Sequence, residues 1–331
     1  MSRLSVSHLD LDGVSAQIVI RQFVGDIQRM NISYGKIDEY INIIDEYCGH
    51  AKPVEVWVTD LSFTLHQLEK LFEVTKRYTD IKFYFIDHHP FDEDYSHIKA
   101  DNLMLLINQK ASGTKLTYLF LKNNRTLINN NIKNDLEKYV EFVDVYDLWK
   151  KENPLFKGAM VYNELFWEFK KDYYFTRFKD DFKLRNSDKE RFKDLMAKKK
   201  KLFEKLDKSG RIFRHEPNGD KRILMMFIDD FKNHIPLDYP GFDVYILISS
   251  YGGISLRLRD DLSDDGTLKD NIVKRALLNK NVDSCGGHPQ AFGANLFDAS
   301  AHNQIEFGKF ILTVVDEELD NLYEKGKNDS K

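Results

Sequence analysis

Three largely apolar segments in the first third of the chain each run directly into acidic or imidazole side chains. Runs of this kind predict buried strands, and parallel strands place their carboxyl ends at one edge of a sheet, where open α/β proteins bind ligands. The pattern therefore predicts a parallel sheet with a polar site at one edge. The segments and the residues that follow them are Leu4–Ser7 before His8-Leu9-Asp10-Leu11-Asp12-Gly13, Val54–Thr59 before Asp60, and Phe83–Ile86 before Asp87-His88-His89.

The residue types at these strand ends point to divalent metal ions. Carboxylates with a few imidazoles suit Mn²⁺ or Mg²⁺, whereas structural zinc sites favour cysteine. If the backbone at His8, Asp10 and Asp12 is extended, the three side chains lie on one face of it. A carboxylate such as Asp60 can bridge two ions about 3.5–4 Å apart, the spacing used for in-line phosphoryl displacement. The sequence therefore predicts a site for more than one metal ion.

Each of these residues also has an ordinary structural explanation. A single aspartate after a strand, such as Asp60, is more often a helix N-cap or turn residue. An isolated His-His pair, such as His88-His89, is more often at the surface or hydrogen-bonded in a core. The occurrence of such residues at three strand ends together favours the metal site.

The motifs at these strand ends resemble those of the DHH phosphoesterase superfamily, which is named for the motif Asp87-His88-His89 seen here. Within the superfamily, the chain resembles most the nanoRNase B type. The resemblance runs from residue 8 to residue 293. The matching segments are His8–Gly13, Val58–Ser62, Asp87–His89, Glu141–Trp149 and the glycine-rich Cys285-Gly286-Gly287-His288-Pro289-Gln290-Ala291-Phe292-Gly293.

The resemblance implies a site that holds two Mn²⁺ ions, with Mg²⁺ as a weaker substitute. One ion would be held by His8, Asp10 and Asp60. The other would be held by Asp12, Asp60, His88 and Asp147. In the same family pattern, His89 would contact the scissile phosphate and Asp87 would orient a histidine. The substrate would be bound by Arg257, Gly286, Gly287 and His288.

Cysteine content, charge and hydropathy exclude several classes of protein. Two cysteines, Cys48 and Cys285, are too few for a disulfide scaffold, so we expect a reducing cytoplasm. No apolar stretch approaches the ~20 residues that span a bilayer, and we expect no membrane partner. The formal net charge of −4 gives no overall basic field for long nucleic acid. Short oligonucleotides need only a few phosphate contacts.

Residues 1–165 alternate apolar strands with helical stretches, which predicts an α/β domain with a doubly wound parallel sheet. Helical periodicity is found at residues 15–23, 64–78, 112–121 and 135–149. Ser112 is expected to be an N-cap first, with a phosphate contact as the less common alternative. In the last helix, Asp144 and Asp147 lie near one face and both are candidates for the fourth-motif carboxylate. The Tyr146-Asp147-Leu148-Trp149 resemblance favours Asp147.

The second half of the chain predicts a charged linker and a smaller α/β domain. Residues 166–211 alternate aromatic and charged residues and predict one long bridging helix, in which the run Lys198–Lys201 is taken as a solvated face. Residues 212–325 form the predicted C-terminal domain, with strands at 223–228, 244–249 and 253–258 and a helix at 270–278. A glycine-rich loop should follow this helix, since glycines let backbone N–H groups approach a phosphate closely.

These expectations combine into one predicted function. The chain would be a Mn-dependent phosphodiesterase or exonuclease that hydrolyses short RNA or DNA oligonucleotides to mononucleotides, in the cytoplasm and with a homodimer as one option. The alternatives within enzymes are hydrolysis of a dinucleotide, of a nucleotide bisphosphate, or of single-stranded DNA from one end. Pyrophosphatase is the least favoured. Outside enzymes, the alternatives are a catalytically weak nucleotide-binding regulator and a structural protein without metal dependence.

Overall fold

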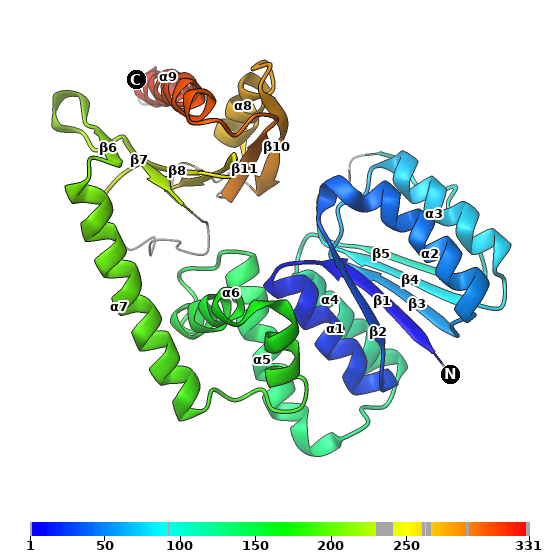
Figure 1. Ribbon diagram of the computed structural model, residues 1–331. Helices are drawn as coiled ribbons and strands as arrows, with labels where there is room; N and C mark the ends of the chain where they lie inside the picture. The colour runs from blue at the N-terminus through cyan, green and yellow to red at the C-terminus, as the bar shows by residue number, and fades with distance from the viewer. Residues whose placement is uncertain are drawn as a thin grey trace. The chain divides into compact units, whose positions relative to one another are not determined.

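The computed structural model describes residues 2–91, 93–229, 241–259, 262, 266–288 and 291–328, which are coloured in Figure 1. The chain forms two compact units, Met1–Phe192 and Lys193–Lys331. No helix in the described ranges is both long and apolar enough to cross a membrane.

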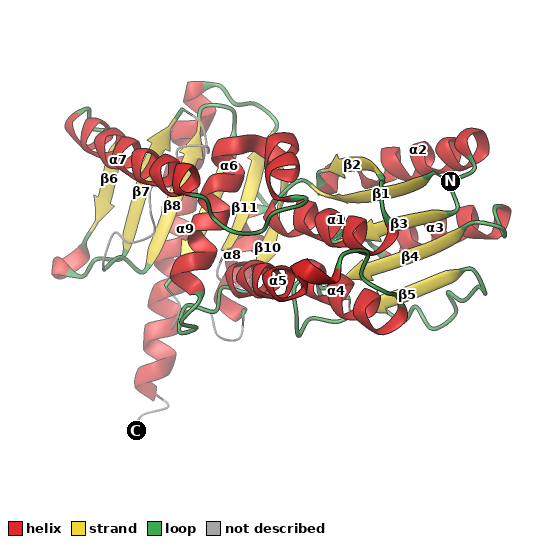
Figure 2. Cartoon of the chain, turned by 90° about the horizontal axis from the view of Figure 1, so that it is seen from below, coloured by secondary structure: helices red, strands yellow, loops and turns green. Residues whose placement is uncertain are grey.

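The first unit is built on a five-stranded sheet in which every neighbouring pair is parallel. The strand order is β2-β1-β3-β4-β5, which can be followed in Figure 2. Because β1 and β3 are neighbours and the chain winds outward from them in opposite directions, this is a doubly wound sheet with a switch point at β1 and β3. The strands are β1 (Arg3–His8), β2 (Gln28–Ile32), β3 (Glu55–Thr59), β4 (Lys82–Asp87) and β5 (Leu103–Ile107).

Helices cover both faces of this sheet, as Figure 1 shows. On β3, Val56 and Val58 pack toward α2 and α3, while Trp57 packs toward α1 and α4. All three side chains are buried, and each contributes about 1.5–3 kcal/mol of transfer free energy. The helices are α1 (Leu11–Val24), α2 (Ile37–Ala51), α3 (Leu65–Arg77), α4 (Gly113–Asn124), α5 (Lys133–Asp147) and α6 (Phe156–Phe178).

Local capping residues explain where the predicted helices begin. Thr64 and Gln67 form a capping box at the start of α3. Ser112 caps α4, because its hydroxyl accepts a hydrogen bond from Lys115 N at 3.3 Å. The N-cap expectation for Ser112 is therefore confirmed. β2, α2 and β5 lie outside the predicted segments.

The long bridging helix predicted within residues 166–211 is wrong. The region contains the end of α6, a turn, and a separate helix, α7 (Asn186–Lys208). Tyr174 and Phe178 of α6 are buried in the core formed with α1, α4 and α5. A buried ion pair between Arg177 and Asp188 holds the turn between α6 and α7. The aromatic residues that appeared to belong to a linker are thus core residues of the first unit.

The second unit is a six-stranded mixed sheet with the order β10-β11-β9-β8-β7-β6. α8 and α9 cover one face, and the end of α7 packs against the other face of β7 and β8. The predicted strands 223–228, 244–249 and 253–258 are confirmed. The elements are β6 (Ile212–His215), β7 (Ile223–Ile228), β8 (Val244–Ser249), β9 (Gly253–Leu258), α8 (Thr267–Ala276), β10 (Val282–His288), β11 (Ala291–Leu296) and α9 (Ala301–Asn328).

The predicted glycine-rich loop is wrong at Gly286 and Gly287. Both residues lie in β10, where Gly286 pairs with Gly293 and Gly287 with Phe292 of β11. Pairing of this edge strand with β11 lets the two glycines form strand in spite of their weak strand propensity. Pro289 and Gln290 of the same motif lie outside the described residues.

Candidate metal centre

The carboxyl ends of three adjacent strands deliver the predicted residues to one edge of the first sheet. His8 is the last residue of β1, Asp60 directly follows β3, and Asp87 ends β4 with His88 and His89 after it. β1 and β3 flank the switch point of the sheet, where open α/β folds bind ligands. The sequence prediction that these strand ends meet is confirmed.

The extended arrangement expected for His8, Asp10 and Asp12 is wrong, because a helix begins within the motif. Asp10 is the N-cap of α1 and accepts a hydrogen bond from Gly13 N at 3.0 Å, and Asp12 lies in the first turn of α1. Gly13 permits this sharp turn, since a Cβ there would lie 2.3 Å from the carbonyl oxygen of His8. The turn, rather than a shared strand face, brings the two carboxylates together.

His88 lies at the centre of three buried or nearly buried carboxylates. Its Nε2 is 3.2 Å from Asp60 Oδ1, 3.4 Å from Asp147 Oδ2 and 3.8 Å from Asp12 Oδ2. His8 Nδ1 lies 2.8 Å from Asp10 Oδ2 on the adjacent side. Within the described ranges, the ion-pair partners of these carboxylates are histidines rather than lysine or arginine.

Three sets of side chains can each offer ligand atoms that all lie within 4.8 Å of one another. Asp60 and His88 each belong to two of them. We refer to all of these residues and Asp87 as the acid cluster. The sets are His8 with Asp10 and Asp60, Asp12 with His88 and Asp147, and Asp60 with His88 and His89.

The N-terminus of α4 fixes the position of Asp12. Gly113 N donates to Asp12 Oδ2 at 2.7 Å, and Thr114 N donates to Asp12 Oδ1 at 2.9 Å. A helix N-terminus has unpaired N–H groups and a positive dipole end, so it suits a carboxylate. Gly113 is required for this approach, because a Cβ would lie 2.8 Å from Asp60 Cβ and 2.9 Å from Asp12 Oδ2.

The two fourth-motif candidates have different surroundings. Asp147, the last residue of α5, faces His88 in the acid cluster. Asp144 is buried one turn earlier and accepts hydrogen bonds from Ser112 N, Lys115 Nζ and Lys150 Nζ. Geometry therefore favours Asp147 over Asp144 as the residue that faces a metal.

Burial and mutual repulsion raise the pKa of several carboxyl groups in the cluster. Burial is the main cause for Asp12, Asp60 and Asp147, and neighbouring aspartates raise the pKa of each further. For Asp10, burial opposes ionisation, but the charge and hydrogen bond of His8 hold its pKa well below the usual value. Such a cluster favours any ligand that adds positive charge.

The donor set fits divalent metal ions. Asp60 Oδ2 and Asp147 Oδ2 are buried and accept no hydrogen bond from the residues that the structure describes. A buried carboxylate oxygen without a partner is costly unless a cation binds it. Oxygen donors with a few imidazole nitrogens suit Mn²⁺ and Mg²⁺.

Asp87 pairs with His89, a neighbouring histidine of the same motif. Asp87 Oδ1 lies 2.8 Å from His89 Nδ1. Burial alone would lower the pKa of His89, but Asp87 raises it above the usual value. Burial lowers the pKa of His88, which favours the neutral imidazole that metal ions bind.

The backbone of Asp60 is strained. Its φ of 55° lies in the left-handed region, which few residues other than glycine adopt, although asparagine, aspartate and histidine adopt it more often than the rest. Such strain costs of order 1–3 kcal/mol and is concentrated at functional sites. The N-cap explanation for Asp60 is excluded, since Thr64 caps α3.

The predicted substrate residues lie in the second unit. Arg257 is half-buried on β9 and pairs in register with Ala291 of β11, which pairs with His288 of β10. Leu256 and Phe292 face the α8 and α9 core, so Arg257 lies on the opposite face of the sheet. The side chain of His288 lies outside the described part of the chain.

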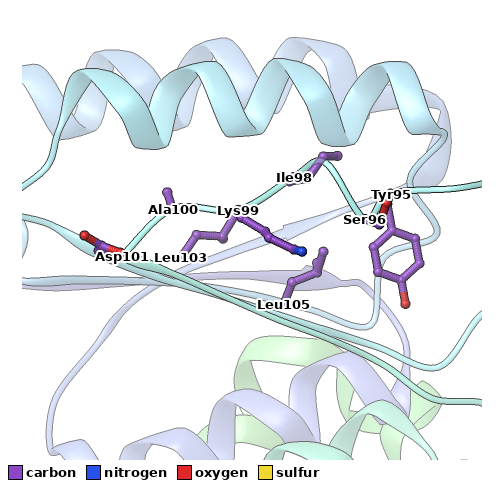
Figure 3. A pocket seen from close by; sticks show the side chains of 8 residues that line it. All are labelled: Tyr95, Ser96, Ile98, Lys99, Ala100, Asp101, Leu103 and Leu105. Carbon is purple, nitrogen blue, oxygen red and sulfur yellow. The ribbon is translucent and has the colours of Figure 1, made fainter.

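A surface hollow of about 410 Å³ lies elsewhere in the first unit and contains no motif residue (Figure 3). It is formed by β5 and the segment before it, including Tyr95, Lys99 and Leu105. The acid cluster, and not this hollow, marks the candidate site. The sequence analysis did not predict Gly113, Lys115 or Lys150. The nearest sequence signals were the Ser112-Gly113-Thr114 helix start and the segment Glu141–Trp149, which ends directly before Lys150.

No protein-family model matches the chain. Among curated proteins, a 3',5'-cyclic-nucleotide phosphodiesterase of Helicobacter pylori is 30% identical over 167 residues, which are 47% of this chain and 46% of that protein. The match thus spans less than half the length of that relative. Oligoribonuclease NrnB of Bacillus subtilis is 25% identical over 316 residues, which are 88% of this chain and 72% of that protein.

Two solved structures share the fold over nearly the whole chain. The exonuclease RecJ bound to manganese has a TM-score of 0.54 at 13% identity, covering 95% of this chain and 90% of that chain. The pGpG-specific phosphodiesterase PggH of Vibrio cholerae has a TM-score of 0.53 at 13% identity, covering 96% of this chain and 100% of that chain. The chain therefore resembles the DHH phosphoesterase superfamily in its Asp87-His88-His89 motif at the end of β4, in its sequence similarity to oligoribonuclease NrnB and in the fold that it shares with RecJ and PggH.

Proposed function

We propose that the chain is a metal-dependent phosphodiesterase that uses two Mn²⁺ ions to hydrolyse short oligonucleotides to mononucleotides. The observation that carries the proposal is the acid cluster, in which Asp60 belongs to one set with His8 and Asp10 and to another with His88 and His89. The names of the two curated relatives, a cyclic-nucleotide phosphodiesterase and an oligoribonuclease, support the same reaction class.

The proposed ligands are those that the family resemblance implies, and most of them lie together in the sets described above. His8, Asp10 and Asp60 would hold one ion, and Asp12, Asp60, His88 and Asp147 would hold the other. When bound, the ions would lower the pKa of a water molecule and neutralise charge on the phosphate. The chain itself orients the ligands through β1, β3, β4 and the N-terminus of α4.

His89 is proposed to bind the scissile phosphate. His89 Nδ1 is hydrogen-bonded to Asp87, and the pKa of His89 is raised. Both features favour a protonated imidazole, which can donate a hydrogen bond to a phosphate oxygen. In the second unit, Arg257, Gly286, Gly287 and His288 are proposed to bind the substrate. An arginine fork matches phosphate oxygens bidentately.

The substrate assay decides between this proposal and its alternatives. Purified protein with Mn²⁺ would be tested against labelled RNA and DNA oligomers of graded length, from dinucleotides upward, and against a 3',5'-cyclic mononucleotide. The cyclic substrate is included because of the Helicobacter pylori relative. Turnover restricted to short oligomers is the expected result. Turnover of the cyclic mononucleotide alone would show that the proposed substrate is wrong. Absence of turnover with every divalent metal tested would contradict the proposed enzymatic activity.

The choice of metal ion, the cellular location and the oligomeric state of the protein are predictions, each with its own test. Mn²⁺ should support activity better than Mg²⁺, since imidazole ligands disfavour Mg²⁺, and Zn²⁺ should substitute poorly. Reconstitution of chelator-treated protein with each metal tests this order, and Mg²⁺ as the best metal would contradict it. Light scattering of the purified protein tests the homodimer, and the cytoplasmic location would be tested by cell fractionation.

A further inference from the structure

Two lysines beside the acid cluster are bound by one buried carboxylate that is not part of it. Asp144 Oδ2 accepts hydrogen bonds from Lys150 Nζ at 2.7 Å and from Lys115 Nζ at 3.2 Å, while Asp144 Oδ1 accepts from Ser112 N at 2.9 Å. The side chain of Asp144 is 1% exposed, whereas those of Lys115 and Lys150 are 23% and 39% exposed.

Both lysines are close in the chain to residues that contact or form the acid cluster. Lys115 directly follows Thr114, whose backbone N–H binds Asp12. Lys150 lies three residues after Asp147. A buried group of like charges attracts nearby ammonium groups strongly, because screening by water is weak there. The described ion pairs nevertheless place both lysines on Asp144 and not on the cluster.

We propose that Asp144 is a positioning residue that keeps Lys115 and Lys150 off the carboxylates of the acid cluster, so that metal ions can bind them. This inference rests on the proposed metal-dependent function. An ammonium group on a ligand oxygen would compete with a metal ion for the same negative charge. By binding both lysines, Asp144 removes this competition while it also anchors the N-terminus of α4.

The two lysines depend on Asp144 to different extents. Lys115 has a second partner, since its Nζ also lies 2.9 Å from Glu141 Oε2. The only ion-pair partner described for Lys150 is Asp144. Replacement of Asp144 should therefore release Lys150 first, which makes Lys150 the residue whose removal should restore metal binding.

Calorimetric titration with Mn²⁺ tests the inference without relying on turnover. Asp144→Asn keeps the shape of the side chain and an oxygen for Ser112 N, but loses the charge that binds the lysines. We expect Mn²⁺ affinity to fall at least tenfold, and the double variant Asp144→Asn with Lys150→Met to recover to within about threefold of the wild type. Unchanged affinity in the single variant, or no recovery in the double variant, would overturn the inference.

Asp188→Asn is the matched control. Asp188 is also a buried carboxylate of the first unit, bound by Arg177 and by Arg185 N at 2.8 Å, so its loss removes a comparable ion pair. We expect a lower thermal midpoint with unchanged Mn²⁺ affinity. A matching fall in Mn²⁺ affinity would mean that any buried ion pair has this effect, and the specific role of Asp144 would be wrong.

A third variant keeps the test decisive if Asp144→Asn does not fold. The side chain of Glu141 is 44% exposed, and Glu141→Gln leaves Lys115 bound to Asp144. Unchanged Mn²⁺ affinity is expected, and a tenfold fall would contradict the inference because Asp144 would not suffice to hold Lys115. A wild-type protein that binds no Mn²⁺ would instead contradict the proposed metal site itself.

Discussion

At the scale of single residues, Asp60 combines a strained backbone, full burial and close approach to other carboxylates. Its place after β3 could be predicted from the apolar run that precedes it. Its left-handed conformation and its close packing against Gly113, far away in the chain, could not. The sequence thus located the residue, and the structure adds its conformation and surroundings.

Replacement of Asp60 by asparagine should separate function from stability. We expect at least a hundredfold loss of turnover, since the proposed bridging ligand loses its charge. The thermal midpoint of the metal-free protein should not fall, because asparagine tolerates the left-handed region and the repulsion from Asp10, Asp12 and Asp147 is reduced. Turnover above a tenth of the wild-type value at saturating Mn²⁺ would contradict the bridging role.

The raised pKa values of the cluster predict how stability depends on pH. In metal-free protein, the unfolded aspartates ionise near pH 4, whereas folded Asp12, Asp60 and Asp147 retain protons to higher pH. The folded state then binds more protons, so these groups lower the free energy of unfolding as pH rises above about 4.

Thermal melts from pH 4.5 to 8 in the presence of a chelator measure this effect. As pH rises, the thermal midpoint of the wild type should fall more steeply than that of Asp60→Asn. The variant lacks one of the three carboxyl groups whose pKa is raised in the folded state. Addition of Mn²⁺ should remove the trend in the wild type. Parallel curves for the two proteins in chelator would mean that repulsion in the cluster does not affect stability.

At the scale of elements, the N-terminus of α4 organises the candidate site. Its first three backbone N–H groups bind Asp144 and Asp12. The periodic pattern predicts this helix, and Ser112 predicts where it begins. Its contacts with Asp144, more than thirty residues away, and with Asp12, more than one hundred residues away, depend on the packing of α1, α4 and α5. The local sequence does not encode that packing. The lysine partners of Asp144 escaped prediction for the same reason.

Gly113→Ala should damage the metal centre more than the fold. A Cβ at Gly113 would lie within 3 Å of Asp60 Cβ and Asp12 Oδ2, so the two ligands must move. We expect a cost of about 1–3 kcal/mol in the free energy of unfolding and a loss of Mn²⁺ affinity of at least tenfold. Urea denaturation and calorimetry measure the two effects.

Gly35→Ala is the control for this substitution. Among the residues that the structure describes, no atom outside the two chain neighbours lies within 4 Å of a Cβ built at Gly35, so the effect of the substitution on unfolding should stay within about 0.5 kcal/mol. Equal Mn²⁺ affinity in Gly113→Ala and Gly35→Ala would show that the close approach of α4 is not needed for binding.

At the scale of the whole molecule, the candidate metal residues and the candidate substrate residues belong to different units. Every residue of the acid cluster lies before Phe192, and Arg257, Gly286 and Gly287 lie after it. The alternating pattern of the chain predicts two domains, yet it assigns the aromatic residues of α6 to a linker. Burial of Tyr174 and Phe178 in the first core corrects that assignment, because composition alone does not show what an aromatic side chain packs against.

This division predicts that Arg257→Ala affects substrate turnover and not metal binding. Calorimetry with Mn²⁺ should match the wild type. Turnover of a dinucleotide should fall by roughly 1.5–3 kcal/mol in kcat/KM, the range for a charge-assisted hydrogen bond to phosphate, while a small chromogenic phosphodiester should be affected much less. Equal losses on both substrates would assign Arg257 a structural role.

Arg275→Ala is the matched control within the second unit. Arg275 lies on α8 and is held by Glu317 and Glu318 of α9, on the side of the sheet opposite to Arg257. Its loss should leave dinucleotide turnover within about twofold of the wild type. A loss as large as that of Arg257→Ala would indicate a general effect of removing an arginine from this unit.

The spread of the acid cluster along the chain has a consequence for biosynthesis. Asp10 and Asp12 emerge early, but Asp147 is translated 135 residues after Asp12, roughly 7 to 27 seconds later at 5–20 residues per second. During that interval the nascent chain carries only part of the proposed ligand set. The complete set forms only after α5 has docked on α1 and α4, so we expect metal loading to follow the folding of the first unit on the ribosome rather than to initiate it.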